Sequence, residues 1–224
     1  MYTLYITNKN YSSWSLRPWV LMTELAIPFR EQLVPYAPGA FASFSPSGRV
    51  PCLVDDDVVV WDSLAIAEYL AERHPGVWPA DPRARAWARC AAAEMHAGFM
   101  TLRERCTMNV GIRVRLRDMP AALEAELARL AALWSDGLAR FGGPFLAGPA
   151  LTAVDAFYAP VAFRIQTYGL ALPEPALAYA ARLRALPAME RWKSAALAER
   201  WRDPMHEDEV TATGTVIEDL RAAP

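Results

Sequence analysis

Cysteine and histidine are scarce in this sequence, with three of each among 224 residues. The cysteines are Cys52, Cys90 and Cys106. Their odd number and wide spacing exclude a disulfide framework and a Cys-x-x-Cys redox motif. The histidines are equally dispersed and show no spacing typical of metal ligands, so we expect no bound metal. Cysteines that do not pair favour the reducing cytoplasm.

The sequence also lacks an excess of basic residues and any long apolar run. The formal net charge is -2 and the sequence pI is about 6.0, which argues against a nucleic-acid-binding surface. No apolar run reaches the roughly 20 residues that span a membrane. Met1–Leu4 does not have the pattern of a secretory signal. We therefore expect a cytoplasmic protein that binds neither nucleic acid nor membrane.

Hydrophobic residues make up 54% of the chain, and its first third alternates between strand-like and helix-like patterns. The acidic run Asp55–Asp57 separates two short apolar segments, which predicts a hairpin. Ser15 can cap the first helix. The expected elements are a strand at Tyr2–Thr7, a helix from Leu16, a strand at Glu31–Val34, a hairpin of Pro51–Val54 with Val58–Trp61, and a helix at Ser63–Arg73.

Strand signals nearly vanish in the rest of the chain. The segment His74–Pro82 is rich in proline and glycine, as a linker would be. Alanine, leucine, glutamate and arginine dominate beyond it and favour helices. The expected helices are Arg83–Cys106, Pro120–Phe141, Ala153–Tyr168, Pro175–Leu183 and Ala188–Arg200, followed by an irregular polar tail from Asp203. The sequence thus predicts an α/β domain over residues 1–76 and an all-α domain over residues 83–224.

Two dipeptides of the first domain are suited to hold a small peptide. Val50-Pro51 is a candidate cis bond, which would turn the backbone of Val50 toward an extended ligand. Asp62-Ser63 places a carboxylate, a hydroxyl and free N–H groups at the start of a helix, where anions are favoured. Each dipeptide alone is also typical of a purely structural role, as a trans proline or a helix cap. Together they indicate a ligand with both an amine and a carboxylate.

The segments around these dipeptides resemble the N-terminal domain of the cytosolic glutathione S-transferase family. The resemblance lies in Ser45–Leu53 and Trp61–Leu70. Gly148–Asp155 further resembles the family's helix-capping motif, with Thr152 as the N-cap and Asp155 as its partner. The resemblance covers roughly Met1–Leu197. It implies an α/β thioredoxin-like domain followed by an all-α helical-bundle domain, the glutathione transferase architecture.

The resemblance also implies how glutathione, the co-substrate, would be held. The backbone of Val50, before the cis Pro51, would pair with the cysteine of glutathione. Asp62 and Ser63 would bind the γ-glutamyl amine and carboxylate. The full set of residues expected to bind glutathione is Ser12, Trp14, Arg49, Val50, Pro51, Asp62 and Ser63.

Thiol activation is expected at the start of the first helix. Glutathione attacks as the thiolate, whereas a free thiol titrates at a pH of about 8.5. A hydroxyl donor at a helix N-terminus would favour the anion. The stretch from Tyr11 resembles the serine-type classes, such as zeta, theta and tau, found in bacterial members among others. Counting back from Arg17 places the catalytic role on Ser12, with Ser13 as the close alternative. The classes that use cysteine are disfavoured, because no cysteine precedes Arg49.

The family binds its electrophile between the two domains. This implies an adaptable, mostly apolar pocket at the first helices of the second domain. An arginine beside it, Arg103 or Arg113, would suit an acidic substrate, although charged residues on helices are usually solvated. The residues expected to line the pocket are Met95, Phe99, Arg103 and Met108.

The function implied is that of a cytoplasmic, homodimeric glutathione transferase active in detoxification. It would join the glutathione thiolate to a small electrophile. Two alternatives stay open: a glutathione-dependent cis–trans isomerase of the maleylacetoacetate type, and a glutathione-binding regulator without turnover. Trp14 stands where the zeta pattern has a cysteine, which disfavours the isomerase. The intact Ser12, Val50, Asp62 and Ser63 argue mildly against the regulator.

Overall fold

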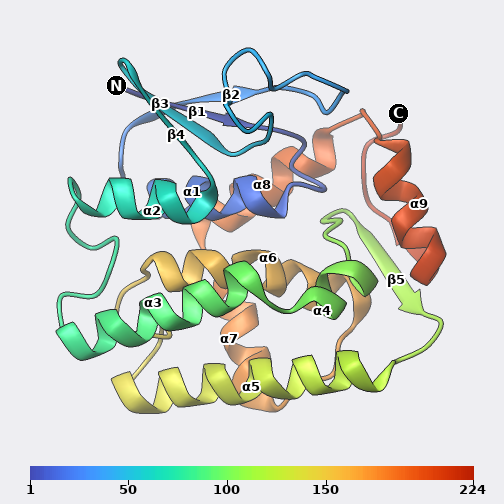
Figure 1. Ribbon diagram of the computed structural model, residues 1–224. Coiled ribbons are helices and arrows are strands. Elements are labelled where there is room, and N and C mark those ends of the chain that lie inside the picture. Colours follow the sequence, from blue (N-terminus) through green and yellow to red (C-terminus); the bar gives the residue numbers. More distant parts are fainter.

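The computed structural model describes residues 1–224 and has a four-stranded mixed sheet lying over a stack of helices (Figure 1). The strands are β1 (Tyr2–Ile6), β2 (Phe29–Leu33), β3 (Cys52–Asp55) and β4 (Val58–Trp61), in the order β2-β1-β3-β4. β1 is parallel to β2 and antiparallel to β3, and β3 pairs with β4 in the expected hairpin. Helices α1 (Ser13–Glu24) and α2 (Ser63–Ala71) lie together beneath the sheet (Figure 1). The α/β arrangement expected for the first part of the chain is confirmed.

Helix α1 begins earlier than the sequence pattern indicated. Its N-cap is Ser12, whose Oγ accepts a hydrogen bond from the Ser15 N–H at 3.4 Å. Ser13 and Trp14 therefore belong to the first turn of the helix. The prediction that Ser15 is the cap was wrong, because serine caps a helix equally well at either position and the pattern did not separate them. The serines expected to activate a thiol thus lie at a helix N-terminus.

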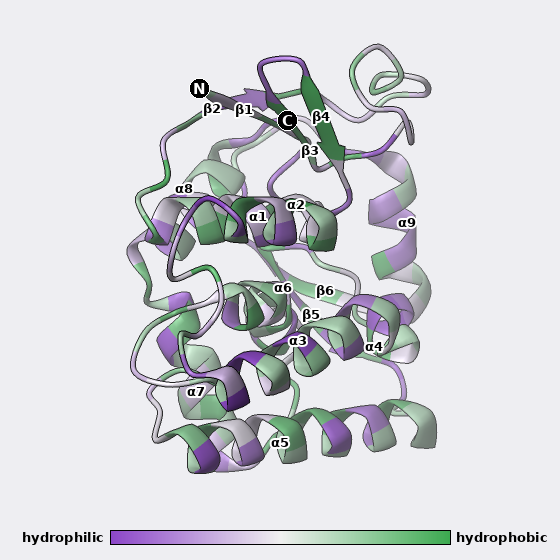
Figure 2. Ribbon diagram, turned by 60° about the vertical axis from the view of Figure 1, so that its left-hand side comes forward, coloured by the Kyte–Doolittle hydropathy of each residue, from purple (hydrophilic) through white to green (hydrophobic).

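The second part of the chain is helical, as expected. Its helices include α3 (Pro82–Ala97), α4 (Met100–Arg105), α5 (Ala121–Phe141), α6 (Ala153–Tyr168), α7 (Glu174–Arg184) and α8 (Pro187–Ala198). The single helix expected over Arg83–Cys106 is divided into α3 and α4, because Phe99 adopts a left-handed backbone conformation with φ 56°. α6 is buried on nearly all sides and packs against α1, α3 and α7. α5 lies at the far side from the sheet, with hydrophobic and hydrophilic residues alternating along it (Figure 2).

Residues 72–81, between α2 and α3, form neither helix nor strand. The expected division between residues 1–76 and 83–224 falls in this segment, and the division stays a prediction. None of the helices combines the length and the apolar composition needed to cross a membrane. No group of three or more histidine, cysteine, aspartate or glutamate residues is arranged to hold a metal ion.

The start of α6 carries the expected capping box. Thr152 is the N-cap, and the Asp155 carboxylate accepts a hydrogen bond from the Thr152 N–H at 2.9 Å. The same carboxylate is fully buried and accepts further hydrogen bonds from the Leu146 N–H at 3.0 Å and the Tyr179 hydroxyl at 2.8 Å. Asp155 therefore ties the loop before α6, the helix itself and α7 together.

The C-terminal segment is ordered, and the expectation of an irregular tail from Asp203 was wrong. It forms helix α9 (Pro204–Thr213) and strand β6 (Gly214–Asp219), and β6 pairs antiparallel with β5 (Ile112–Leu116). Gly214 is required at the close approach, because a Cβ there would lie 2.5 Å from Val114 Cγ1. The alternation of apolar and arginine residues in Ile112–Leu116 is a strand signal that the prediction missed.

Arg221 fixes the position of α9. Its side chain donates hydrogen bonds to Glu207 at 2.6 and 2.9 Å and to Asp219 at 2.7 and 2.9 Å. The Tyr11 hydroxyl donates to the same Glu207 carboxylate at 2.6 Å. These hydrogen bonds connect the C-terminal segment to the loop that precedes α1.

Candidate active site

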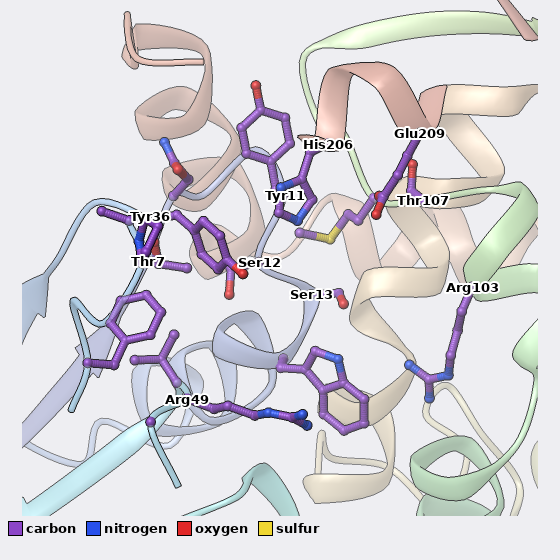
Figure 3. A pocket seen from close by; sticks show the side chains of 18 of the residues that line it. Thr7, Tyr11, Ser12, Ser13, Tyr36, Arg49, Arg103, Thr107, His206 and Glu209 are labelled. Carbon is purple, nitrogen blue, oxygen red and sulfur yellow. The ribbon is translucent and has the colours of Figure 1, made fainter. Parts of the chain in front are cut away.

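A cavity of about 540 Å³ opens at the N-terminus of α1. Its walls are the segment after β1, the loop of residues 36–50, and residues from α4, α6 and α9. Figure 3 shows Ser12 and Ser13 inside this cavity, with His206 and Glu209 of α9 on one side and Arg49 on another. The sheet part and the helical part of the molecule both contribute to it.

A smaller cavity of about 340 Å³ continues from the first toward α2. The two cavities share Trp14, Arg49 and Val50, and the smaller one adds Pro51, Asp62 and Ser63 among its lining residues. The Val50-Pro51 bond is cis. All seven residues expected to bind glutathione therefore line one two-part cleft.

Two serine hydroxyls at the start of α1 differ in their hydrogen bonding. The Ser12 hydroxyl donates to Ser15 Oγ at 2.7 Å, and Ser15 is fully buried. Ser13 Oγ lines the cavity and makes no hydrogen bond within the protein. Either hydroxyl can donate to an anion in the cavity, Ser12 after a rotation about its Cβ–Oγ bond.

At the other end of the cleft, Asp62 and Ser63 begin α2. Asp62 has φ 76°, a conformation that is strained for a residue with a side chain. Its carboxylate caps the helix by accepting from the Leu64 N–H at 2.7 Å. Ser63 Oγ accepts a hydrogen bond from Arg17 at 3.2 Å, so the hydrogen of its own hydroxyl remains available to a ligand.

Arg17 and His96 support this end of the cleft, and the sequence analysis missed both roles. Arg17 is 1% exposed, and its guanidinium lies 4.1 Å from the centre of the Trp14 ring. Burial, followed by repulsion from other arginines, lowers the pKa of Arg17. Burial likewise lowers the pKa of His96, against the opposing effect of Asp62. A neutral His96 with its proton on Nε2 suits both contacts, because Nε2 lies 3.5 Å from Asp62 Oδ2 and Nδ1 lies 3.5 Å from an Arg17 nitrogen.

An arginine amid the apolar residues of α1 was the signal for Arg17. No sequence pattern distinguishes His96 in the same way. It lies on α3 and comes close to Asp62 only because α3 packs against the first domain.

The residues expected to line the acceptor pocket divide into two groups. Arg103 and Met108 line the larger cavity. Met95 and Phe99 do not, because both are buried in the hydrophobic core at 1% and 6% exposure. Arg113 lies on β5, outside the cavity. Lining residues that the sequence analysis did not identify include Tyr36, Phe41, Arg164, His206 and Glu209.

Comparison with known proteins agrees with this geometry. Residues 11–73 match the family model described as the N-terminal domain of glutathione S-transferase. A probable maleylacetoacetate isomerase from Caenorhabditis elegans is 32% identical over 103 residues, which are 44% of this chain and 48% of that protein. The match thus spans about half the length of this curated relative.

Solved structures match over more of the chain. A glutathione transferase homologue from Burkholderia with bound glutathione is 25% identical, with a TM-score of 0.68 over 87% of this chain and 97% of that one. A theta-class glutathione S-transferase from Xanthomonas axonopodis pv. citri, also with glutathione bound, is 26% identical, with a TM-score of 0.62 over 85% and 95% of the two chains. Residues 11–73 thus match the N-terminal domain of glutathione S-transferases, and the chain as a whole has the fold of these proteins.

Proposed function

We propose that the protein is a glutathione transferase, which binds glutathione in the two-part cleft and joins its sulfur to an electrophilic small molecule. The observation that carries this proposal is the single cleft from Asp62-Ser63, past the Val50 backbone, to the serine hydroxyls at the start of α1. Relatives of the same fold contain glutathione. The larger cavity offers room for the second substrate beside these hydroxyls.

The γ-glutamyl end of glutathione is assigned to the start of α2. The Asp62 carboxylate would accept hydrogen bonds from the amine. The Ser63 hydroxyl and the N-terminus of α2 would donate to the carboxylate. The buried Arg17 beside Ser63 adds a positive charge behind this anion. The backbone of Val50 would hold the cysteine of glutathione between the two ends of the cleft.

The thiolate is assigned to Ser12, with Ser13 as the alternative. When Ser12 turns its hydroxyl toward sulfur, the buried Ser15 hydroxyl can donate to Ser12 Oγ in return, at the 2.7 Å separation of the two oxygens. A hydrogen bond received in this way makes Ser12 a better donor. The thiol proton leaves to solvent, and the thiolate attacks the electrophilic carbon to form the C–S bond. At a carbon with a leaving group, that group departs with the electron pair of its bond; at an activated double bond, the π electrons move to the second carbon, which takes a proton from solvent.

Ser63→Ala should weaken the binding of reduced glutathione by about 1.5–3 kcal/mol, since it removes one hydrogen bond to a charged group. Isothermal titration calorimetry on the full chain measures this change directly. Ser194→Ala, at an exposed position of α8, is the matched control and should bind glutathione as the wild type does. An unchanged affinity of Ser63→Ala would remove Ser63 from the glutathione site.

A second candidate function is the glutathione-dependent cis–trans isomerisation of a maleyl-type acid. The likeness to a probable maleylacetoacetate isomerase supports it. The thiolate would add to the double bond, and after rotation of the single bond glutathione would be expelled again. An isomerase regenerates glutathione in every turnover, whereas a transferase consumes it. Thiol titration during the reaction separates the two.

We further propose a homodimer, as the family resemblance implies, with two-fold symmetry. The sheet part of one subunit would pack on the helices of its partner. Light scattering at micromolar concentration should give about twice the monomer mass of 24.8 kDa. A mass equal to that of the monomer would contradict this arrangement.

A further inference from the structure

Two arginines of the larger cavity, Arg103 on α4 and Arg164 on α6, have no acidic partner. No carboxylate oxygen lies within 4.0 Å of either guanidinium. Arg164 is only 4% exposed. A buried positive charge is costly unless an anion or several hydrogen-bond acceptors compensate it.

Arg164 is only partly satisfied by the protein. Its Nη1 donates to the backbone carbonyls of Cys106 and Arg103, the latter at 3.5 Å. Nε is completely buried without an acceptor, and Nη2 makes no hydrogen bond within the protein. Nη2, unlike Nε, is not completely buried, so Nη2 is the donor of Arg164 that an anion in the cavity can reach.

Arg103 leaves donors free beside the same cavity. Its Nε donates to the Gly98 carbonyl at 2.9 Å, and its Nη2 donates to the Met95 carbonyl. Its Nη1 makes no hydrogen bond within the protein, and its guanidinium lies 4.9 Å from the centre of the Trp14 ring. Figure 3 shows Arg103 approaching the cavity from the helical side, opposite Ser12.

The charges that face the cavity are unbalanced. Three arginines line it, the third being Arg49, against a single carboxylate, Glu209. Glu126, near Arg103, uses its carboxylate to accept from the backbone N–H groups of Thr101 and Leu102. Burial, followed by repulsion from Arg103, lowers the pKa of Arg164 to about 10, and burial also lowers that of Arg103. Arg164 nevertheless stays charged near neutral pH. The cavity therefore has an excess of positive charge that would favour the binding of an anion.

We infer that the acceptor substrate carries a carboxylate, which binds to Arg164 and Arg103 on the side of the cavity opposite the reacting sulfur. This inference rests on the proposed function. It specifies that the electrophile is acidic, whereas the family resemblance implied a mostly apolar pocket. The apolar residues Phe41 and Met108 would contact the body of the substrate. The carboxylate would thereby orient the electrophilic carbon toward the thiolate at the start of α1.

A matched pair of substrates tests this inference. The acid is a chloronitrobenzoate with chlorine para to the carboxylate and ortho to the nitro group, and its partner is the corresponding neutral benzamide. In both, the thiolate forms a bond to the ring carbon that carries chlorine, and chloride leaves with the electron pair of the C–Cl bond. Arg164→Met should lower the ratio of kcat/KM for the acid to kcat/KM for the amide by about 10- to 100-fold, the loss expected for one charged hydrogen-bond partner.

Arg184→Met is the control, because Arg184 also donates to a carbonyl of α6, that of Ala162, but lies outside the cavity. It should leave the acid-to-amide ratio unchanged. Arg103→Gln is the second variant, used if Arg164→Met fails to fold, and it should lower the ratio in the same direction. Circular dichroism shows which variants are folded.

The outcomes separate the inference from the proposed function. If the folded variants retain the wild-type acid-to-amide ratio while the wild type consumes glutathione with the amide, the carboxylate subsite is wrong and the transferase stands. If Arg164→Met raises the KM for glutathione equally with both acceptors, the arginines bind a carboxylate of glutathione and the inference is overturned. If the wild type joins glutathione to neither compound nor to other electrophiles, the proposed function itself fails.

Discussion

Ser12→Ala should lower kcat by about one to three powers of ten while changing the binding of glutathione by only a few fold. Thiol and thiolate occupy the same volume, so the contacts that we propose at Val50, Asp62 and Ser63 should hold both forms about equally. Only a donor directed at sulfur distinguishes the two forms, and each unit by which the thiol pKa falls corresponds to about 1.4 kcal/mol. Steady-state kinetics with a neutral electrophile, together with calorimetry of glutathione binding, measures the two effects separately.

Ser13→Ala is the matched comparison, because Ser13 is the next residue, lines the same cavity and is not the helix cap. It should lower kcat much less than Ser12→Ala. The opposite order would transfer the role to Ser13, whose hydroxyl has no partner within the protein. Full activity in both variants would mean that another donor holds the thiolate, and the assignment to the serine-type classes would be wrong.

Asp155→Ala should lower the free energy of unfolding by about 3 kcal/mol or more. The substitution leaves three buried donors, the N–H groups of Leu146 and Thr152 and the hydroxyl of Tyr179, without their acceptor. Each unsatisfied buried donor costs about 1–3 kcal/mol. Urea denaturation followed by circular dichroism gives the change, which stems from folding because Asp155 lies outside the cleft.

Asp136→Ala is the matched control for Asp155→Ala. Asp136 is exposed on α5, where it accepts hydrogen bonds from Arg140 and Trp87 at 2.8 Å each. Exposed pairs of this kind contribute about 1 kcal/mol or less. An equal decrease in the free energy of unfolding in the two variants would contradict a special role for the capping box at α6.

The elements predicted well from the sequence are those that depend on local patterns. The β3–β4 hairpin follows from an acidic turn between apolar segments, and α6 occupies the range Ala153–Tyr168 that was expected. The pairing of β5 with β6 escaped prediction because its partners, such as Arg115 and Thr215, are a hundred residues apart. Pairing at that separation depends on how the helices between them pack.

In the cleft, too, the features set by local sequence could be predicted, whereas those set by the packing of distant segments could not. Val50-Pro51 and Asp62-Ser63 are short motifs whose chemistry can be read locally, and the structure brings both to one cleft. Arg164 was missed although it stands amid the apolar residues of α6, the same signal that marks Arg17 in α1. Its burial results from α6 being enclosed by its neighbours.

The pKa of the thiol of bound glutathione tests the central claim most directly. The ultraviolet absorbance of the thiolate, followed during a pH titration of the wild-type complex, measures it. The account predicts a pKa below the value of about 8.5 for a free thiol, so that the thiolate is the main form near neutral pH, and a partial return toward that value in Ser12→Ala. A bound thiol that titrates at the same pH as free glutathione would contradict the claim that this cleft activates glutathione.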